Sequence, residues 1–283
     1  MKKTHLIILS LFLTSAIIIT ATVITYKALT VPKSKKYVVE TIEANSKGYI
    51  KVGIISDAQL PQEEKNLYGW DYATVMNGAD HLIKALKYYK SQNVDMIVFN
   101  GDMVNATGDY AAYSAYNKIL DYVYGEDRAE APHIIYPMGN HEFYGGNQEH
   151  NFYKSTGLPL NTRTIVNGYS FISISNSKLE KGDEELAESN DTLADGTYNE
   201  KRIEFLKEQL AAANTEDPNK PIFVFIHMPI SNIVNGGHWA TPQYEEIYSI
   251  LKEYPQAVVF TGHSHYCMSD ERAIMQKDFT VIN

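Results

Sequence analysis

Five short polar motifs along this chain of 283 residues each follow a stretch of apolar, strand-like sequence. In order, the motifs are Asp57-Ala58-Gln59, Gly101-Asp102-Met103, Gly139-Asn140-His141-Glu142, His227-Met228-Pro229 and Gly262-His263-Ser264-His265. Stretches with helical spacing of apolar residues lie between several of them, and this alternation predicts an α/β domain with a largely parallel sheet. Because ligands of open α/β sheets bind beyond the carboxyl ends of the strands, we expect the motifs to meet in one site.

The pattern of apolar residues also predicts where the individual elements lie. Strands are expected at residues 50–55, 95–100, 134–137, 221–226 and 257–261, and a β-hairpin at residues 164–175. Helices are expected at residues 71–92, 110–123, 200–213 and 244–251. Residues 178–196 are acidic and polar without a period, which predicts a surface loop. The chain ends in a strand-like stretch, residues 279–283, and the lack of a following partner strand favours the interpretation of a domain truncated at its C-terminus.

The N-terminus predicts a membrane or export signal. Residues Leu6 to Tyr26 carry no formal charge and follow the basic segment Met1-Lys2-Lys3. An apolar run of roughly 20 residues is long enough to cross a bilayer as a helix, whereas the apolar part of a cleaved secretory signal is usually shorter. We therefore expect an N-terminal signal or anchor helix at residues 1–27, with an uncleaved anchor preferred, and then a polar linker at residues 28–48. Both routes predict an extracytoplasmic domain at residues 49–283, anchored in the cell membrane or secreted.

The charge and the cysteine content exclude some classes of function. The formal net charge is −9, and an acidic surface repels phosphates, so we expect no nucleic acid polymer as a partner. A small phosphate ester remains compatible with this charge, since bound divalent cations would invert the local field. Because Cys267 is its single cysteine, the chain has no intramolecular disulfide.

The residue types in the motifs are those that hold a pair of divalent cations. Asp57 and Gln59 are two residues apart just after a strand, so their side chains can point to one side, and the same spacing relates His263 and His265. Asp102 follows a glycine, which lets the backbone turn sharply and bring the carboxylate inward. The remaining candidate ligands are Asn140 and His227.

Taken as a set, the five motifs resemble those of the calcineurin-like metallophosphoesterase family, whose pattern is DxH, GD, GNH[ED], H and GHxH. The resemblance covers the chain from about Tyr49 to its end. It implies a four-layer αββα sandwich, in which two sheets are faced by helices, and two divalent metal ions. By this resemblance, one metal ion would be held by Asp57, Gln59, Asp102 and His265. The other would be held by Asp102, which bridges the two, and by Asn140, His227 and His263.

The resemblance also implies a reaction, the hydrolysis of phosphate esters by a metal-bound hydroxide. Two cations can clamp the attacking and leaving oxygens at phosphorus and acidify a bound water. His141 would not be a ligand but would stabilise the phosphoryl oxygens or protonate the leaving group. Gln59 stands where the family usually has histidine, and its harder oxygen favours manganese, with magnesium, iron and zinc as alternatives. Asn105 stands where many relatives have an aspartate that orients the catalytic histidine, and it would hold His141 through its amide.

Several alternatives stay open from the sequence. The substrate is a monoester or a diester, and it is a small molecule or a component of the cell envelope. The rival interpretation is a non-catalytic metal-binding or ligand-binding module that retains the fold, and its support is Gln59 and Asn105. Ordinary loop packing competes with a substrate-binding role for His238, and Phe143 and Tyr144, which follow the third motif, are candidates to line the pocket.

Overall fold

The structure of the protein is a computed structural model. It describes residues 36–45, 48–60, 72–105, 111–143, 148–177, 196–230, 233–234, 237, 241 and 243–283. Residues 35–283 form one compact unit. The expected helix at residues 1–27, residues 178–195 of the expected loop, and the candidates Tyr144 and His238 lie outside the described residues. In the described part of the chain, no helix has both the length and the apolar character that crossing a membrane requires.

The larger of two sheets has seven strands, in the order β1-β5-β6-β7-β8-β10-β9. Their bounds are β1 (Tyr37–Ile42), β5 (Asn161–Val166), β6 (Tyr169–Ile174), β7 (Ile222–Ile226), β8 (Ala257–Phe260), β9 (Ile274–Gln276) and β10 (Thr280–Ile282). β5 and β6 form the expected hairpin, with the antiparallel pair Val166–Tyr169 across the Asn167-Gly168 turn. Both turn residues have positive φ (50° and 77°), which matches the right-handed twist of a hairpin. β10 lies between β8 and β9, so the last strand-like stretch is not at the edge of this sheet.

The smaller sheet has three parallel strands in the order β2-β3-β4. Their bounds are β2 (Val52–Ile55), β3 (Met96–Phe99) and β4 (His133–Ile135). Successive side chains of a strand point to opposite faces, and in β3 both faces are buried. Ile97 and Phe99 pack against helices, whereas Met96 and Val98 pack towards the larger sheet. A strand buried on both faces needs a continuous apolar run, which is why the sequence located β3 well.

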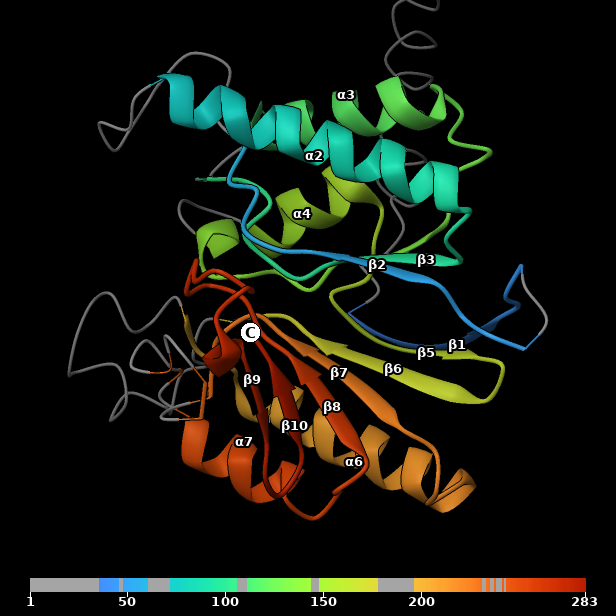
Figure 1. The fold of residues 1–283 in the computed structure, drawn as a ribbon, viewed down its shortest axis with the longest axis vertical. Helices are drawn as coiled ribbons and strands as arrows, with labels where there is room; N and C mark the ends of the chain where they lie inside the picture. The colour runs from blue at the N-terminus through green and yellow to red at the C-terminus, as the bar shows by residue number, and fades with distance from the viewer. Residues whose placement is uncertain are drawn as a thin grey trace, which may run out of the picture. The chain divides into compact units, whose positions relative to one another are not determined.

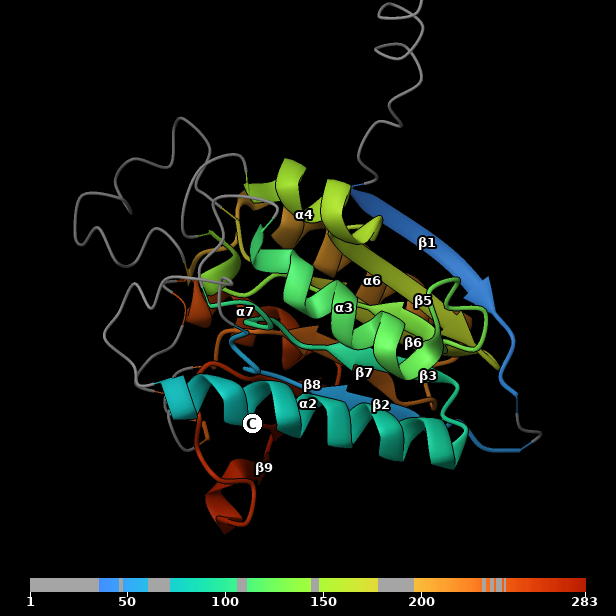
Figure 2. The same cartoon turned by 90° about the horizontal axis from the view of Figure 1, so that it is seen from above.

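Helices cover the outer faces of both sheets. α2 (Tyr72–Gln92), α3 (Ala111–Tyr124) and α4 (Gln148–Thr156) lie on the smaller sheet, and α6 (Glu200–Glu216) and α7 (Tyr244–Leu251) lie on the larger one (Figure 1, Figure 2). Three clusters of buried apolar side chains fill the spaces between these layers. The middle cluster joins the two sheets through residues such as Val98, Phe171 and Phe225. The described residues therefore show the layer order expected of the αββα sandwich.

Residues 37–42 correct the predicted linker. We expected residues 28–48 to lie outside the domain, but Tyr37–Ile42 form β1 and pair in parallel with β5 along their whole length. The strand lies at the edge of the sheet, where only alternate side chains are partly buried, so no apolar run marks it in the sequence. Tyr37 and Val39, for example, are 39% and 54% exposed. The domain therefore includes β1.

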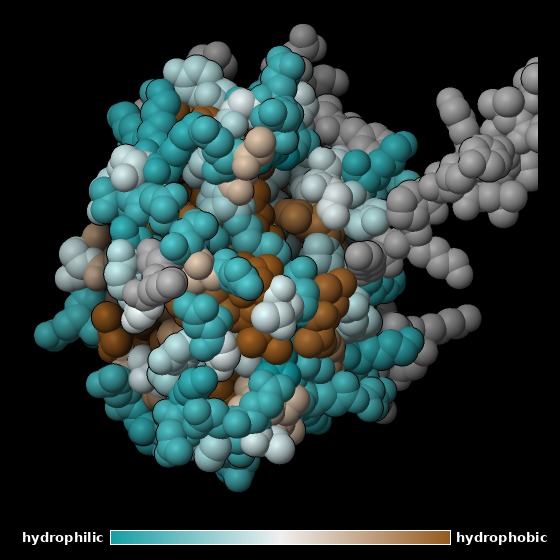
Figure 3. Space-filling model, turned by 90° about the vertical axis from the view of Figure 1, so that its right-hand side faces the viewer, coloured by the Kyte–Doolittle hydropathy of each residue, from teal (hydrophilic) through white to brown (hydrophobic). Residues whose placement is uncertain are grey.

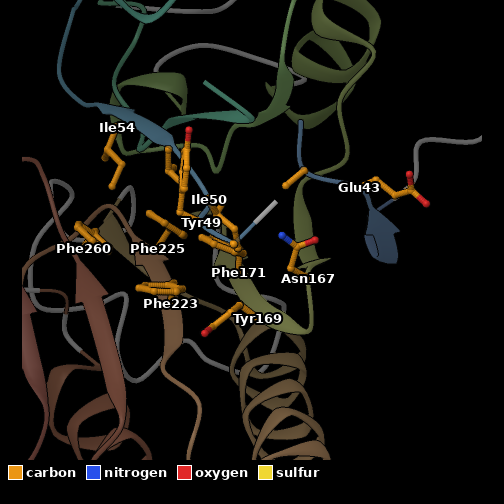
Figure 4. Close-up of a pocket in the computed structure, with 13 residues that line it drawn as sticks. Glu43, Tyr49, Ile50, Ile54, Asn167, Tyr169, Phe171, Phe223, Phe225 and Phe260 are labelled. Carbon is orange, nitrogen blue, oxygen red and sulfur yellow. The ribbon is translucent and has the colours of Figure 1, made fainter. Parts of the chain in front are cut away.

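The two sheets differ in width, and a cavity of about 940 Å³ opens between them beside β2, the edge strand of the smaller sheet. Phe171, Phe223 and Phe225 line it from the larger sheet, and Ile50 and Ile54 face them from the other side (Figure 4). On the side of the molecule shown in Figure 3, apolar surface gathers in the middle of the face and is bordered by hydrophilic residues. None of the predicted site residues lines this cavity, so it lies apart from the candidate site.

Candidate metal centre

The five motifs converge, as expected, at the carboxyl ends of strands. Asp57, Asp102 and His141 lie in the segments that follow β2, β3 and β4 of the smaller sheet. His227 and His263 follow β7 and β8 of the larger sheet. The candidate site therefore straddles the two sheets, and neither sheet alone contains the full set of predicted residues.

The backbone is strained at most of the predicted ligands. Left-handed conformations with positive φ occur at Asp57 (58°), Gln59 (44°), Asp102 (53°), His263 (65°) and His265 (55°). For residues with a side chain this conformation costs of order 1–3 kcal/mol, and it persists only where the surroundings hold it. Here the Gln59 N–H donates to the Asp102 carbonyl (2.9 Å) and the Leu60 N–H donates to the Met103 carbonyl (2.8 Å). These hydrogen bonds tie the loops after β2 and β3 together, and concentrated strain of this kind is typical of functional sites.

The Asp57 carboxylate lies among groups from the loop that follows β8. Its Oδ1 is 3.3 Å from His265 Nε2, and its Oδ2 accepts a hydrogen bond from the His263 backbone N–H (3.0 Å). The Ser56 hydroxyl also donates to this carboxylate. Gly262 permits the close approach, because a Cβ at this position would meet Asp57 Oδ2 at 2.7 Å. The glycine of the fifth motif is therefore required by packing.

Asp102 and His227 form the buried centre of the site. Both side chains are 0% exposed, and His227 Nε2 lies 3.1 Å from Asp102 Oδ2. The His227 Nδ1–H donates to the Asn100 carbonyl (2.8 Å), which fixes the orientation of the ring and leaves Nε2 directed at the carboxylate. This contact does not have the geometry of a hydrogen bond, and the described part of the chain offers neither atom another hydrogen-bond partner. Buried polar atoms normally have a partner, so the pair has the features of a cation site.

The charges of the site also favour a cation. Burial alone lowers the pKa of His227, but the carboxylates of Asp102 and Asp57 raise it to about 10. Burial raises the pKa of Asp102, but the imidazoles of His227 and His141 hold it below its usual range. Burial and the charge of His227 lower the pKa of His263 to about 4. A proton on His227 therefore offsets part of the negative charge of the two carboxylates, and a metal ion can take the place of that proton.

Three donors lie especially close together. Asp102, His227 and His263 each offer one ligand atom, and these atoms all lie within 4.8 Å of one another. Asn140, the remaining predicted ligand on this side, is buried in the loop that follows β4. This loop lies against the His227 ring, since a Cβ on Gly139 would meet His227 Cδ2 at 2.7 Å. The donor set, with carboxylate, imidazole and amide groups, suits a divalent transition metal.

Gln59, His141 and His265 meet on the other side of the centre. The Gln59 amide nitrogen is 3.2 Å from His141 Nε2 and 3.3 Å from His265 Nε2. A half-turn of the amide keeps its shape and would present Oε1 at the same place. The His141 Nδ1–H donates to the backbone carbonyl of Asn105 (2.6 Å), so Nε2 faces the site. This differs from the predicted contact through the Asn105 amide, and a backbone contact does not depend on the residue type at position 105.

Two supporting residues were missed in the sequence. Asn100 donates from Nδ2 to the carbonyls of Ile226 (3.4 Å) and Phe260 (3.2 Å), which links the end of β3 to β7 and β8. Glu142 is fully buried, and burial and the charge of Asp102 raise its pKa. Each is a polar residue beside an apolar strand or inside a motif, but neither has the spacing of a ligand. Phe143 packs in the apolar cluster between the smaller sheet and its helices, so core packing is its role.

Solved structures of low sequence identity resemble this one. A dimetal phosphatase from Danio rerio is 18% identical, with a TM-score of 0.59, and the match covers 82% of this chain and 86% of that protein. The protein TT1561 of Thermus thermophilus is 13% identical, with a TM-score of 0.46 over 75% of this chain and 81% of its own. At 18% identity, the first similarity concerns the fold alone. No curated protein sequence matches the chain.

A family model gives the identification that these structures do not. Residues 50–267 match the model described as calcineurin-like phosphoesterase. The matched region contains all five motifs, from Asp57 to His265, and it spans most of the chain. The resemblance that the motifs showed is thereby confirmed. The chain belongs to the calcineurin-like phosphoesterase family.

Proposed function

We propose that this protein hydrolyses phosphate esters at the metal centre, with two divalent cations as cofactors. The observation that carries the proposal is the buried approach of Asp102 to His227, 3.1 Å apart, with Asp57, His263 and His265 around them. Two carboxylates and three imidazoles in so small a space have the charge and the donor types that divalent transition metals prefer. Membership of the family supports the same class of reaction.

In this proposal the two cations share Asp102. One also binds Asp57, Gln59 and His265, and this grouping is supported by the 3.3 Å distances from His265 Nε2 to Asp57 Oδ1 and to the Gln59 amide. When bound, such a pair of cations polarises the phosphoryl group and lowers the pKa of a bound water towards neutrality. The other ligands of the second cation are Asn140, His227 and His263.

His141 is the acid–base group of the chain itself. Its Nδ1–H is held by the Asn105 carbonyl, and its Nε2 lies 3.2 Å from the Gln59 amide and 3.9 Å from Asp102 Oδ2. The imidazole therefore faces the same space as the predicted ligands. From there it would donate to a phosphoryl oxygen or give its proton to the leaving oxygen. Because it is not in the ligand set, its loss should stop turnover and leave metal binding intact.

For the metal and the substrate we propose manganese and a phosphate ester from a small molecule or from the cell envelope. The amide oxygen of Gln59 is a harder donor than an imidazole and supports manganese over zinc. The formal net charge of −9 argues against a nucleic acid polymer as the substrate.

For the location we propose an extracytoplasmic domain that is anchored by residues 1–27 or secreted after their cleavage. The support comes from the sequence, in which an uncharged stretch from Leu6 to Tyr26 follows basic residues. Fractionation of cells that produce the full chain tests this proposal. We expect the protein in the membrane or extracellular fraction, and its recovery from the cytosol would contradict the proposal.

Metal titration of the purified protein tests the hydrolase proposal. Manganese, magnesium and zinc are added separately to metal-free protein. Hydrolysis of p-nitrophenyl phosphate and of bis-p-nitrophenyl phosphate is followed, and bound metal is counted per chain. We expect two manganese ions per chain and the highest turnover with manganese. The ratio of the two rates then ranks monoesters against diesters.

Three variants separate catalysis from metal binding. Asp102→Asn should lose both metal and turnover, whereas His141→Ala should keep the metal and lose turnover by about 10²–10⁴-fold. His150→Ala is the matched control, since His150 is exposed on α4, and it should behave as the wild type does. No turnover with any metal, together with less than one bound ion per chain, would favour the non-catalytic binding module instead.

A further inference from the structure

Glu142 is a carboxylate sealed beside the metal centre, although it is not among the predicted ligands. It lies in the short 3₁₀ helix His141–Phe143, and its side chain is 0% exposed. Its Oε2 accepts hydrogen bonds from the backbone N–H groups of Asp102 (2.9 Å) and Gly139 (2.7 Å). Its Oε1 accepts from the backbone N–H of Met103 (2.9 Å) and from the Tyr136 hydroxyl (2.6 Å). One side chain thus joins the loops after β3 and β4.

Two of these donors, the backbone N–H groups of Asp102 and Met103, are consecutive in the chain and belong to a left-handed turn. Gly101 and Asp102 both have positive φ, 86° and 53°. Successive N–H groups in turns of this kind form a concave nest that binds an anion. The Glu142 carboxylate is the anion in this nest, and it binds the backbone of the very residue whose side chain is predicted to bridge the two cations.

The two loops also hold each other reciprocally. Glu142 accepts the N–H of Asp102, while Asp102 Oδ1 accepts the N–H of His141 (2.8 Å). Each loop therefore supplies one carboxylate, which accepts a hydrogen bond from a backbone N–H group of the other loop. A strained conformation such as that of Asp102 persists only where several contacts hold it, and Glu142 provides two of them, at Asp102 and at Met103.

We propose that Glu142 is the positioning residue of the metal centre: it holds Asp102 in the conformation that sets its carboxylate beside His227. It acts through the backbone and touches neither the substrate nor a cation. The effect on metal binding rests on the proposed function, whereas the effect on the Asp102 loop does not. Without the Glu142 carboxylate, the turn at Gly101 and Asp102 loses its hydrogen-bond acceptor. The Asp102 carboxylate is then no longer held in one position.

Glu142→Gln tests the proposal with little change in shape. An amide has a single oxygen and places its NH₂ group against N–H donors, so at least one of the backbone donors loses its acceptor. Tyr136→Phe removes one hydrogen bond to Glu142 and keeps the aromatic ring, which packs against Phe99. Asp95→Asn is the matched control. Asp95 is a carboxylate only 5% exposed that accepts the backbone N–H of Lys51 (2.7 Å) at the opposite end of β3.

The first readout needs neither metal nor turnover. Amide hydrogen exchange is measured by NMR on the metal-free protein. The N–H groups of Asp102 and Met103 should exchange at least about tenfold faster in Glu142→Gln than in the wild type. In Asp95→Asn these two N–H groups should exchange at the wild-type rate. A structural loss that is not specific to this loop would raise exchange in both variants.

The second readout is manganese binding, by equilibrium dialysis and by electron paramagnetic resonance. Loss of a supporting residue typically weakens metal binding by about 10–100-fold, and we expect this range for Glu142→Gln, with loss of the exchange-coupled spectrum of paired ions. Turnover should return at saturating manganese. Tyr136→Phe should shift binding in the same direction by a smaller factor.

These readouts can overturn the proposal. Wild-type exchange and manganese binding in both Glu142→Gln and Tyr136→Phe would do so, and so would an equal loss of binding in Asp95→Asn. Should Glu142→Gln fail to fold, Tyr136→Phe decides by the same two readouts. If the wild-type protein itself binds no manganese, the proposed function fails, and hydrogen exchange still decides whether Glu142 holds the Asp102 loop.

Discussion

At the scale of single residues, several predicted ligands of the metal centre have a left-handed backbone conformation, which glycine adopts more easily than other residues. His265 is an example, with φ 55° and a side chain that is 44% exposed. His265→Gly should raise the free energy of unfolding of the metal-free protein by about 1 kcal/mol, because the strain is relieved and little packing is lost. The hydrogen bond to Asp57 raises the pKa of His265, so this ion pair offsets part of the gain at low pH, and urea unfolding is measured over a series of pH values, in which the gain should grow as pH rises. The same variant should bind manganese more weakly.

Asn93→Gly is the control for the prediction that His265→Gly gains stability and loses affinity for manganese. Asn93 has φ 50° just past the end of α2, far from the motifs in sequence. Glycine there should give a similar gain in stability and no change in manganese binding. A lower free energy of unfolding in His265→Gly at every pH of the series would show that strain at this position is not relieved by glycine.

The protonation of His227 gives a second prediction at this scale. Burial lowers its pKa, but Asp102 and Asp57 raise it to about 10, so the metal-free protein holds a proton there at pH 7.5. Manganese must displace this proton, and its affinity should rise about tenfold per pH unit until pH approaches that value. In the metal-free protein, the contribution of His227 to stability is complete below its unfolded pKa of about 6.5 and is lost as pH rises through about 10.

Calorimetry in buffers of different ionisation enthalpy measures the released protons. We expect close to one proton from His227 for each pair of manganese ions bound at pH 7.5. Binding without proton release, at an affinity that does not change between pH 6.5 and 8.5, would mean that His227 is already neutral in the metal-free site.

At the scale of elements, Asn100 joins the two sheets. Its Nδ2 donates to the carbonyls of Ile226 and Phe260, so it connects β3 to β7 and β8 at the level of the centre. Asn100→Ala should lower the free energy of unfolding by about 1–3 kcal/mol in urea titrations, because two carbonyl groups lose their donor inside the protein. Gln256→Ala removes a partly buried hydrogen bond to Asn214 and should cost less. An equal decrease in the free energy of unfolding in both variants would show that the hydrogen bonds between the sheets contribute no more to stability than an ordinary, partly buried hydrogen bond.

The elements that the sequence predicted well are those whose burial leaves a clear period. β3, β7 and β8 were each placed close to their observed bounds because nearly every side chain in them is apolar, and α6 shows a helical stripe. β1 and α4 were not predicted. α4 is short and mostly polar, and β1 borders the sheet, so neither needs a pattern that stands out.

The site was predictable to the same extent. The motif spacing pointed to the ligand candidates because ligands must carry particular donor atoms. It did not point to Glu142 or Asn100, since both act on backbone groups that become neighbours only after folding. A contact with a backbone group can be made by any type of residue, so the sequence does not reveal it. The contact of His141 with the Asn105 carbonyl is a further example.

At the scale of the whole molecule, β1 closes the larger sheet at β5. A chain that begins at residue 49 would lack β1 and expose the edge of β5, whose side chains are almost all buried. Exposed edges pair with other chains, so we expect this truncated chain to aggregate and to unfold at least about 5 °C below a chain that begins at residue 36. Size-exclusion chromatography and thermal unfolding of the two chains test this. Two equally stable monomers would show that β1 is dispensable.

The placement of β1 has a consequence for the order of events during synthesis. Tyr37 leaves the ribosome early, but its partner in the sheet is Asn161, which is synthesised much later. β1 therefore stays unpaired while the three strands of the smaller sheet, which are closer together in the sequence, can already assemble. The ligand candidates complete their set only with His263 and His265, near the end of the sequence. In the proposed function, a nascent chain would therefore lack part of the ligand set for the metal pair before that point. In the proposed function, the supply of metal in the compartment where this set is completed therefore acts together with the donor types in selecting the metal, since raw affinity among such ions does not favour manganese.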